Sequence, residues 1–383
     1  MTRRIPIAVA AAALVALALV PSGAGAANGS RPRIVGGKPI PIAQAPWQVA
    51  LAYSPSYRPG DAEQRQLCGG TLVAPTLVIT AAHCVSNESG SFKPARQFSV
   101  ISGRTTLSAS DGLELPVESI WVPENTGDRP LYDPRRGSWD MVMLRLPSAA
   151  IGTPIKLAGP DEASLWAPGR PALVSGWGSV SQHPSYPDSL RGAEIGVMPD
   201  SFCRLIYGPN YDQQTSMCAG TFLGTRDTCY GDSGGPLVVP TASGEYRLIG
   251  DTSYGRRCGT PNSPGVYGRL AADPVRSVLQ GAAVELAGAS IVGTAGLPPT
   301  SLSPTGAREN AWIVAYQRCR RGCRAYFASL CKAADAGFKC QIETVSGRRG
   351  AKTNCRQGVY VSAATGTLER RLVGQRRCSS GSA

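Results

Sequence analysis

Short apolar runs separated by turn-forming residues make up most of this chain. Between residues 34 and 292, runs such as Leu77-Val78-Ile79 alternate with clusters of Gly, Pro, Ser and Asn. This pattern is typical of short antiparallel strands, so we expect an all-β fold of two antiparallel β-barrels. A segment from Asp273 to about Ala287, rich in Ala, Leu and Val, predicts a helix that closes this region.

The N-terminus carries one long apolar run. Arg3 and Arg4 precede apolar residues 5–20, and small residues follow as far as Ala26. This order is typical of a cleaved secretory signal peptide, which we place at residues 1–26. A transmembrane anchor is the alternative, but the run is short and no second apolar stretch of about 18 residues follows. We therefore expect a secreted, extracellular protein without a transmembrane anchor, in which residues 27–33 form a short propeptide.

The composition changes near residue 293. Residues 293–310 are rich in Gly, Pro, Ser and Thr and predict a linker, after which residues 311–383 form a small separate domain. The net charge of +13 is concentrated at this end, because residues 308–383 hold 15 Lys and Arg against 4 Asp and Glu, whereas residues 34–307 hold 20 against 22. The domain is either a module with a solvated cationic surface or a tether to a polyanion such as a cell-wall polymer, an acidic glycan or nucleic acid.

Twelve cysteines in an exported chain predict disulfides. The C-terminal domain contains Cys319, Cys323, Cys331, Cys340, Cys355 and Cys378. Six cysteines allow 15 connectivities, and the sequence does not select one. Zinc is the alternative, since Cys319 and Cys323 are spaced like ligands, but export and the lack of any histidine after residue 183 argue against it. We expect no metal and no cofactor.

One glycine-lined turn carries the most specific chemistry in the chain. Within residues 231–236, Ser233 stands among glycines, so backbone N–H groups can face an oxyanion beside its hydroxyl. A serine nucleophile requires a base, and the chain has only 2 histidines. His83 follows an apolar strand and has Cys84 beside it, whereas His183 lies in a polar loop. His83 therefore suits a base that needs a fixed orientation.

The third member of such a site is a buried carboxylate that orients the imidazole. Asp140 precedes the apolar run 141–144, and an acid at the head of a buried strand is seldom left unpaired. Asp140 could instead cap a turn ahead of a core strand, as many Asp residues do. The requirement for an acid beside the other two members favours the catalytic role.

Several segments together resemble the trypsin and chymotrypsin family of secreted proteases, and they occur in the family's order. They span about two thirds of the chain, from residue 34 to about residue 290. The segments are Ile34-Val35-Gly36-Gly37, Trp47-Gln48-Val49, Leu67-Cys68-Gly69-Gly70-Thr71-Leu72, Ala81-Ala82-His83-Cys84, Asp140-Met141-Val142-Met143-Leu144, Ser175-Gly176-Trp177-Gly178 and Gly231-Asp232-Ser233-Gly234-Gly235-Pro236. One match alone carries little weight, but the ordered set is specific for the family.

The resemblance implies a serine endopeptidase that works through an acyl-enzyme intermediate, with the active site in the cleft between the two β-barrels. Ser233 is expected to attack the scissile carbonyl, His83 to take and return the proton, and Asp140 to orient the imidazole. The backbone amides of Gly231 and Ser233 are expected to form the oxyanion hole. The family match also implies the disulfides Cys68–Cys84, Cys203–Cys218 and Cys229–Cys258.

The resemblance further implies a preference for protein or peptide substrates with Arg or Lys before the scissile bond. Asp227, six residues before the nucleophile, matches the base of the primary pocket, where a buried carboxylate binds a cation. Gly255 and Gly265 match wall positions that leave room for a long side chain. The other expected substrate-binding residues are Thr228, Ser253 and Tyr254.

The family match also implies activation by cleavage. A cut after Arg33 would free the ammonium group of Ile34, which is expected to pair with Asp232 inside the protein. Because a buried carboxylate without its partner is costly, the uncleaved chain is expected to be a zymogen that lacks a formed pocket and oxyanion hole.

Some positions depart from the family pattern. Tyr254 stands where the family usually has tryptophan. Arg256 and Arg257 lie where the pocket entrance is expected, and these cations should disfavour basic residues in neighbouring subsites. Arg104 lies in the loop that binds calcium in vertebrate trypsins, at a position where an acidic ligand is expected, which argues against calcium dependence.

Two alternatives to a digestive protease stay open. The first is a narrow regulatory protease, restricted by Arg257 and tethered to a polyanionic surface by its C-terminal domain. The second is a non-catalytic binding protein on the same fold. That alternative predicts a broken triad, pocket or activation site, and none of these is broken in the sequence.

Overall fold

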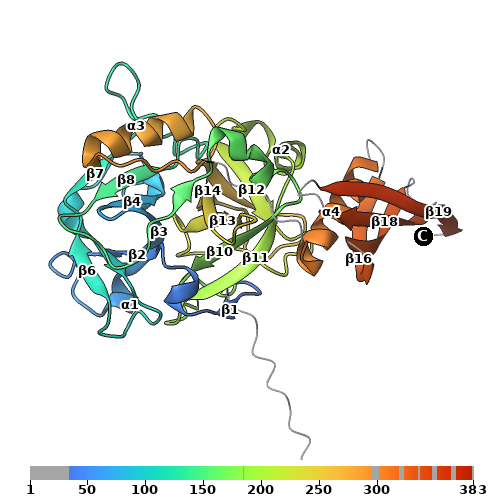
Figure 1. The fold of residues 1–383 in the computed structure, drawn as a ribbon, viewed down its shortest axis with the longest axis horizontal. Helices are drawn as coiled ribbons and strands as arrows, with labels where there is room; N and C mark the ends of the chain where they lie inside the picture. Colours follow the sequence, from blue (N-terminus) through green and yellow to red (C-terminus); the bar gives the residue numbers. More distant parts are fainter. Residues whose placement is uncertain are drawn as a thin grey trace, which may run out of the picture. The chain divides into compact units, whose positions relative to one another are not determined.

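The computed structural model describes residues 34–183, 185–294, 302–318, 323–334, 337–346, 352–363 and 368–381. The expected signal peptide and propeptide, with Arg33, lie outside the described residues, as does Cys319. Strands dominate the described part of the chain and form three sheets (Figure 1).

The first sheet has seven antiparallel strands and curls into a half-barrel, drawn in blue to cyan in Figure 1. The strands are β2 (Gln48–Tyr53), β3 (Gln66–Ala74), β4 (Leu77–Thr80), β5 (Phe98–Ser102), β6 (Leu113–Pro116), β7 (Ser119–Trp121) and β8 (Val142–Arg145). Their order is β6-β5-β2-β3-β4-β8-β7, and β6 and β7 do not pair with each other within the described structure. Buried Leu51, Leu72, Phe98 and Leu144 fill the concave side.

The second sheet closes into a six-stranded barrel. The strands are β10 (Pro171–Gly176), β11 (Arg191–Val197), β12 (Ser216–Gly220), β13 (Pro236–Pro240), β14 (Tyr246–Tyr254) and β15 (Gly265–Arg269). Strand β12 pairs with both β15 and β11, which closes the barrel. The short strands β1 (Lys38–Pro39) and β9 (Lys156–Leu157) add to its edges. The expected all-β architecture is confirmed, with one closed barrel and one half-barrel.

Few helices occur in the two-barrel region. Helix α3 (Val275–Ala287) matches the expected closing helix, and its Leu279, Ala282 and Ala283 pack on the cluster that contains Leu157 and Leu248. The other α-helices are α1 (Ala62–Arg65) and α2 (Asp200–Tyr207). Single-turn or short 3-10 helices lie at Ile42–Gln44, Ala82–Cys84, Ala95–Gln97, Pro160–Trp166 and Gly208–Asn210.

The segment expected to be a linker as far as residue 310 instead becomes helical at residue 304. Helix α4 (Pro304–Arg318) is preceded by Ser303, whose Oγ accepts a hydrogen bond from the Gly306 N–H (3.0 Å). Serine before the helix and proline in its first position are start signals, so the Pro and Ser content that suggested a linker marks a helix N-terminus here. Ala307 and Ala311 are completely buried.

Helix α4 packs against a separate antiparallel sheet in the C-terminal region. The strands are β16 (Cys323–Ala334), β17 (Gly337–Ser346), β18 (Lys352–Ser362) and β19 (Glu369–Gly381), paired in chain order. The disulfide Cys331–Cys340 links β16 to β17, and Cys355–Cys378 links β18 to β19. These are the two pairs that the structure describes among the six C-terminal cysteines.

The same helix also contacts the second barrel. Trp312 packs edge-on against Phe202 of α2, with ring centroids 4.7 Å apart. The Asn310 side chain donates to the Gly169 carbonyl at 2.5 Å, and the buried carboxylate of Glu309 accepts a hydrogen bond from the Phe222 N–H. Helix α4 therefore belongs to one continuous hydrophobic cluster with both regions.

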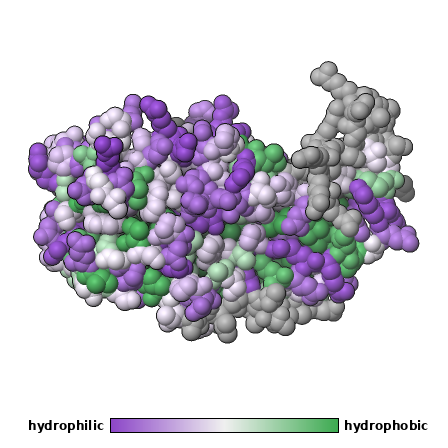
Figure 2. Space-filling model, turned by 90° about the horizontal axis from the view of Figure 1, so that it is seen from above, coloured by the Kyte–Doolittle hydropathy of each residue, from purple (hydrophilic) through white to green (hydrophobic). Residues whose placement is uncertain are grey.

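Exposed apolar side chains are scattered over the described surface. On the face drawn in Figure 2, hydrophilic residues are interspersed with small hydrophobic patches. The large hydrophobic residues most exposed to solvent come from distant parts of the chain: Tyr57, Ile151, Tyr186, Leu205, Leu223, Tyr230 and Val284. None of the described helices combines the length and the apolar character needed to cross a membrane.

Candidate active site

His83 lies on the short 3-10 helix that follows β4, and it contacts Asp140 through both backbone and ring. The His83 N–H donates to Asp140 Oδ1 (2.9 Å), and His83 Nδ1 lies 2.8 Å from Asp140 Oδ2. Ser253 Oγ donates to the same Oδ2 at 2.5 Å. The Asp140 side chain is 3% exposed, and each of its oxygens has a partner. The expected acid and base therefore meet in a buried, fully hydrogen-bonded arrangement.

Each of these two groups shifts the pKa of the other. Burial alone would raise the pKa of Asp140, but the charge of His83 and the hydrogen bonds from His83 and Ser253 outweigh it and lower the pKa. Burial alone would lower the pKa of His83, but the charge and hydrogen bond of Asp140 outweigh it and raise the pKa. The pair thus favours an ionised carboxylate beside an imidazole that accepts a proton readily.

Ser233 lies on a tight turn before β13 that requires glycine. Gly231 and Gly234 have φ angles of 89° and 74°, and a Cβ on Gly234 would lie 2.1 Å from Thr80 Oγ1. The Gly69 N–H donates to the Ser233 carbonyl (2.7 Å), which ties the turn to the first sheet. Within the described structure, the N–H groups of Gly231 and Ser233 donate to no protein acceptor. Both are therefore available to an oxyanion.

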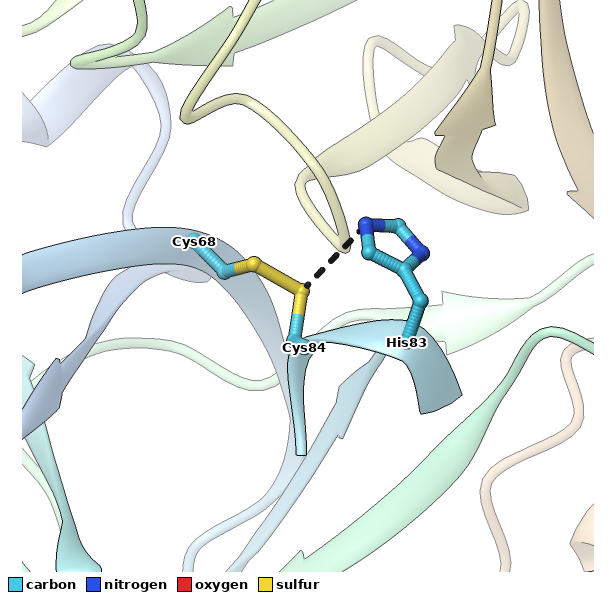
Figure 3. A group of neighbouring side chains, drawn as sticks. All are labelled: Cys68, His83 and Cys84. Atoms are coloured by element: carbon cyan, nitrogen blue, oxygen red, sulfur yellow. Dashed lines mark hydrogen bonds between the residues drawn. A yellow bond between two sulfur atoms is a disulfide. The ribbon is translucent and has the colours of Figure 1, made fainter. Parts of the chain in front are cut away.

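The imidazole and the serine hydroxyl are not hydrogen-bonded to each other in the described structure. The Nε2 of His83 lies 3.8 Å from the Sγ of Cys84, which is bonded to Cys68 (Figure 3). In ligand-free enzymes, catalytic hydrogen bonds are often long or poorly aligned and tighten when substrate binds. The structure therefore brings His83 and Asp140 together, whereas the hydrogen bond between His83 and Ser233 is expected to form when substrate binds.

Cys68, His83 and Cys84 also lie close enough together to suggest a metal site, since their ligand atoms fall within 4.8 Å of one another. A metal binds cysteine as a thiolate, and both sulfurs are used in the Cys68–Cys84 disulfide. This cluster does not fit a metal ion.

A pocket of about 230 Å³ opens beside Ser233, and Asp227 lies in its wall. Asp227 is 5% exposed, and its Oδ2 accepts a hydrogen bond from the Gly259 N–H (3.0 Å). Its Oδ1 has no partner among the described residues. Burial raises the pKa of Asp227 to about 7, more than the hydrogen bonds from Gly259 and Thr228 lower it. An unpaired buried oxygen is costly, so the pocket favours a ligand that donates hydrogen bonds and carries positive charge.

The glycines in the pocket wall keep it open. A Cβ on Gly265 would lie 3.3 Å from Asp227 Oδ1 and would crowd that oxygen. Gly255 lines the same pocket, and a Cβ there would meet nothing closer than the Gly265 Cα at 4.0 Å, so it would project into empty space. The remaining expected substrate-binding residues also line this pocket: Thr228, Ser253 and Tyr254.

Two of the expected activation residues, Ile34 and Asp232, belong to the second-barrel region. Ile34 is completely buried in its core, and Asp232 is also completely buried. Each carboxylate oxygen of Asp232 accepts one backbone N–H at 2.9 Å, but no cation pairs with it among the described residues. Burial raises the pKa of Asp232 to about 7. The Val35 carbonyl accepts the Asp227 N–H (3.0 Å), which ties the segment after Ile34 to the primary pocket.

Three disulfides brace the loops that carry these residues. Cys68–Cys84 joins β3 to the His83 helix, Cys203–Cys218 joins α2 to β12, and Cys229–Cys258 joins two segments that line the primary pocket. These are the pairs that the resemblance implied.

Arg104 lies in the loop for which the sequence argues against calcium binding. Its guanidinium donates to the carbonyls of Leu107 (2.9 Å) and Asp111 (2.6 Å). A cationic side chain therefore already occupies two carbonyl oxygens of this loop.

Comparison with known proteins decides the family. The family model described as Trypsin matches residues 34–275, which is more than half of the 383-residue chain. The chain belongs to the trypsin family. The match ends before α4, so the C-terminal region of this trypsin-family protein lies outside it.

Matches to individual proteins support the same family assignment. A trypsin from Saccharopolyspora erythraea is 38% identical over 239 residues, which are 62% of this chain and 94% of that protein. The mouse transmembrane protease serine 11G is 32% identical over 62% of this chain and 53% of its own length. The structure of mouse neuropsin, a serine protease, matches with a TM-score of 0.50 and 32% identity over 61% of this chain and 94% of that one. This trypsin-family chain is therefore a trypsin-like serine endopeptidase.

Sequence reasoning missed one unusual residue near the site of this protease, Asp251 on β14. Asp251 is completely buried, and neither carboxylate oxygen has a partner among the described residues. Burial, and then the charge of Asp140, raise the pKa of Asp251 well above its usual value. The signal in the sequence is an acid inside the otherwise apolar or small run 248–253.

Replacing Asp251 by valine should stabilise the fold. A buried acceptor without a partner costs about 1–3 kcal/mol, and the cost grows with pH. Because the folded state holds a proton that the unfolded chain releases above pH 4 or so, wild-type stability falls as pH rises from there toward the raised pKa. Thermal unfolding at pH 5 and pH 8 should show that Asp251→Val is more stable than the wild type, and that this difference in stability is larger at pH 8. Asp111→Asn, at an exposed carboxylate, is the control; a gain of the same size there, or none for Asp251→Val, would contradict the argument.

Proposed function

We propose that this trypsin-family endopeptidase cleaves peptide bonds that follow Arg or Lys. The observation that carries the proposal is the unpaired, buried Oδ1 of Asp227 in the pocket beside Ser233. A guanidinium or ammonium group would supply both the missing donor and the missing charge. Binding of that cation would also lower the pKa of Asp227 from about 7, so binding and ionisation of the pocket support each other.

The chemistry assigns one role to each member of the site. Ser233 Oγ forms a bond to the scissile carbonyl carbon while His83 takes the hydroxyl proton, and Asp140 stabilises the imidazolium that results. The free N–H groups of Gly231 and Ser233 bind the oxyanion of the tetrahedral intermediate. His83 then gives the proton to the leaving amine. Water attacks the acyl-enzyme by the same route and releases the second product.

The same proposal includes a secreted zymogen. The N-terminal pattern supports export, and the five described disulfides are typical of an oxidising compartment. Cleavage after Arg33 would place an ammonium group on Ile34, which could neutralise Asp232. The carboxylate of Asp232 is completely buried, and a buried charge gains most from a partner.

Chromogenic peptides that differ only in the residue before the scissile bond test the proposal. With protein whose N-terminus has been sequenced and found to be Ile34, we expect cleavage after Arg and Lys and none after Phe or Ala. Asp227→Ser should lower kcat/KM for the arginyl peptide by roughly 200- to 5,000-fold, since removal of one partner of a buried pair costs 3–5 kcal/mol.

The phenylalanyl peptide is the internal control for this variant. Asp227→Ser should leave its slow cleavage unchanged or raise it, because no charge then has to be desolvated in the pocket. Wild-type protein that cleaves after Phe or Ala as readily as after Arg would refute the proposed specificity while leaving the enzyme class intact.

A role for the C-terminal domain as a polyanion tether remains a proposal based on charge. Some of its described arginines are engaged within the protein: Arg370 donates to Asn310 (2.6 Å), and the Arg371 guanidinium lies 4.8 Å from the centroid of the Tyr360 ring. Arg376 and Arg377 on β19 are exposed and are the described residues best suited to an anionic polymer.

A further inference from the structure

We propose that this protease prefers substrates with acidic residues just before the Arg or Lys that it cleaves. The inference rests on the proposed function, because it concerns the substrate residues next to the one that enters the primary pocket. It is carried by four exposed arginines that surround two adjoining pockets: Arg135, Arg136, Arg256 and Arg257.

The two pockets share a wall. The primary pocket contains Asp227, and a second pocket of about 430 Å³ is lined by His83 and by the rings of Tyr132 and Tyr207. Ser253 and Tyr254 line both. Because the side chain before the scissile bond enters the primary pocket and His83 lies beside that bond, the preceding substrate residues pass along this shared wall into the second pocket.

Two arginines line each of the two pockets. Arg256 and Arg257 line the primary pocket, and Arg135 and Arg136 line the second one. An arginine stays protonated at any pH at which the enzyme works. A substrate chain that runs along the shared wall therefore passes through a region of positive charge before it reaches the negative charge of Asp227.

The acidic residues near these arginines are each engaged elsewhere or exposed. Asp227 would be paired with the substrate cation, and the Asp212 carboxylate, whose charge acts on Tyr254, accepts hydrogen bonds from the Gln214 N–H and the Thr215 hydroxyl. The Arg136 Nε lies 3.9 Å from Asp133 Oδ2, with side chains 65% and 40% exposed, so this ion pair is weak. Asp140 also faces the second pocket, but its carboxylate is committed to His83 and Ser253.

The remaining arginines keep their charge available. Arg256 donates to the Ile206 carbonyl and lies 5.7 Å from the centroid of the Tyr207 ring, contacts that position the guanidinium without neutralising it. Arg135 and Arg257 have no acidic partner among the described residues. The positive charge of the arginines would attract a substrate carboxylate and repel a substrate ammonium group. The cluster therefore selects acidic residues and rejects basic ones.

A matched peptide series tests the inference. Each peptide ends in Arg at the scissile bond, and one of the three preceding positions carries Glu, Ala or Lys in turn. At low ionic strength we expect at least one position where Glu gives kcat/KM about tenfold above Ala and Lys gives a value about tenfold below it. These ratios should shrink as salt is added, because exposed charges are screened.

Variants assign the effect to the arginines. In the double variant Arg135→Gln/Arg257→Gln, the Glu-to-Ala ratio should fall to about threefold or less. Arg96→Gln, at an exposed arginine outside both pockets, should leave the ratio unchanged. A Glu-to-Ala ratio near one at all three positions, or an undiminished ratio in the double variant, would overturn the inference while arginyl cleavage continued. Loss of all arginyl cleavage in wild-type protein would instead overturn the proposed function on which it rests.

Discussion

Replacing Ser233 by alanine should lower kcat/KM for an arginyl peptide by roughly 10⁶-fold, the size of loss seen when an unrelated triad protease loses its serine. The hydroxyl is the atom that becomes acylated, and no neighbouring group can replace it. The turn around Ser233 depends on Gly231 and Gly234 and on the bond from the Gly69 N–H to the Ser233 carbonyl, none of which involves the hydroxyl. The variant should therefore fold normally.

Steady-state kinetics on purified wild-type and variant protein measure this loss. The control is binding of a small aryl amidine to the primary pocket, which reports on Asp227 and should be unchanged in the variant. Activity within tenfold of wild type would show that Ser233 is not the nucleophile. Loss of both activity and amidine binding would show misfolding, and Ser233→Thr would then provide a second test of the hydroxyl.

Replacing Asp140 by asparagine should lower kcat by about 10⁴-fold, the effect of that substitution in a trypsin-like triad. An amide in place of the carboxylate can donate to the ring and hold His83 in the wrong tautomer. It also removes the negative charge that, with its hydrogen bond, raises the pKa of His83 against the opposing effect of burial. The acidic limb of the pH–rate profile should accordingly move to lower pH, because the base then loses its proton more easily.

A purely structural role for Asp140 would not produce both the loss of kcat and the shift of the acidic limb of the pH–rate profile. It would lower activity through loss of folded protein and leave the pKa of the remaining active fraction unchanged. The measurement is kcat/KM from about pH 4 to pH 10 for both proteins, with folded fraction determined by thermal unfolding. An unshifted acidic limb would contradict the proposed coupling between Asp140 and His83.

Much of the candidate site could be predicted because its parts are contiguous motifs on short strands and turns. The expected places of Asp227 at the base of the pocket and of Gly265 in its wall come from the resemblance to the trypsin and chymotrypsin family, whose motifs carry their spacing with them. Asp140 heads β8 and His83 follows β4, two strands that pair directly, so their contact is a consequence of sheet order.

Other features of the site and fold could not be predicted, because they depend on contacts between segments that are distant in the sequence. The ring of His83 points toward Cys84 through a choice of side-chain torsion. Asp251 is buried because β14 pairs with β13 on one side and β15 on the other, which covers a side chain that polarity alone would place outside. Residues 304–310 have a linker-like composition, yet they form a helix because the barrel and the C-terminal sheet both pack on it.

The position of helix α4 has a consequence for the solubility of the catalytic domain by itself. Trp312 covers Phe202, and the same cluster includes Phe222 of the second barrel. A chain that ended before residue 304 would present these aromatic rings to water, and such a patch favours self-association. The burial of Phe202 therefore depends on the chain continuing beyond the catalytic domain into α4.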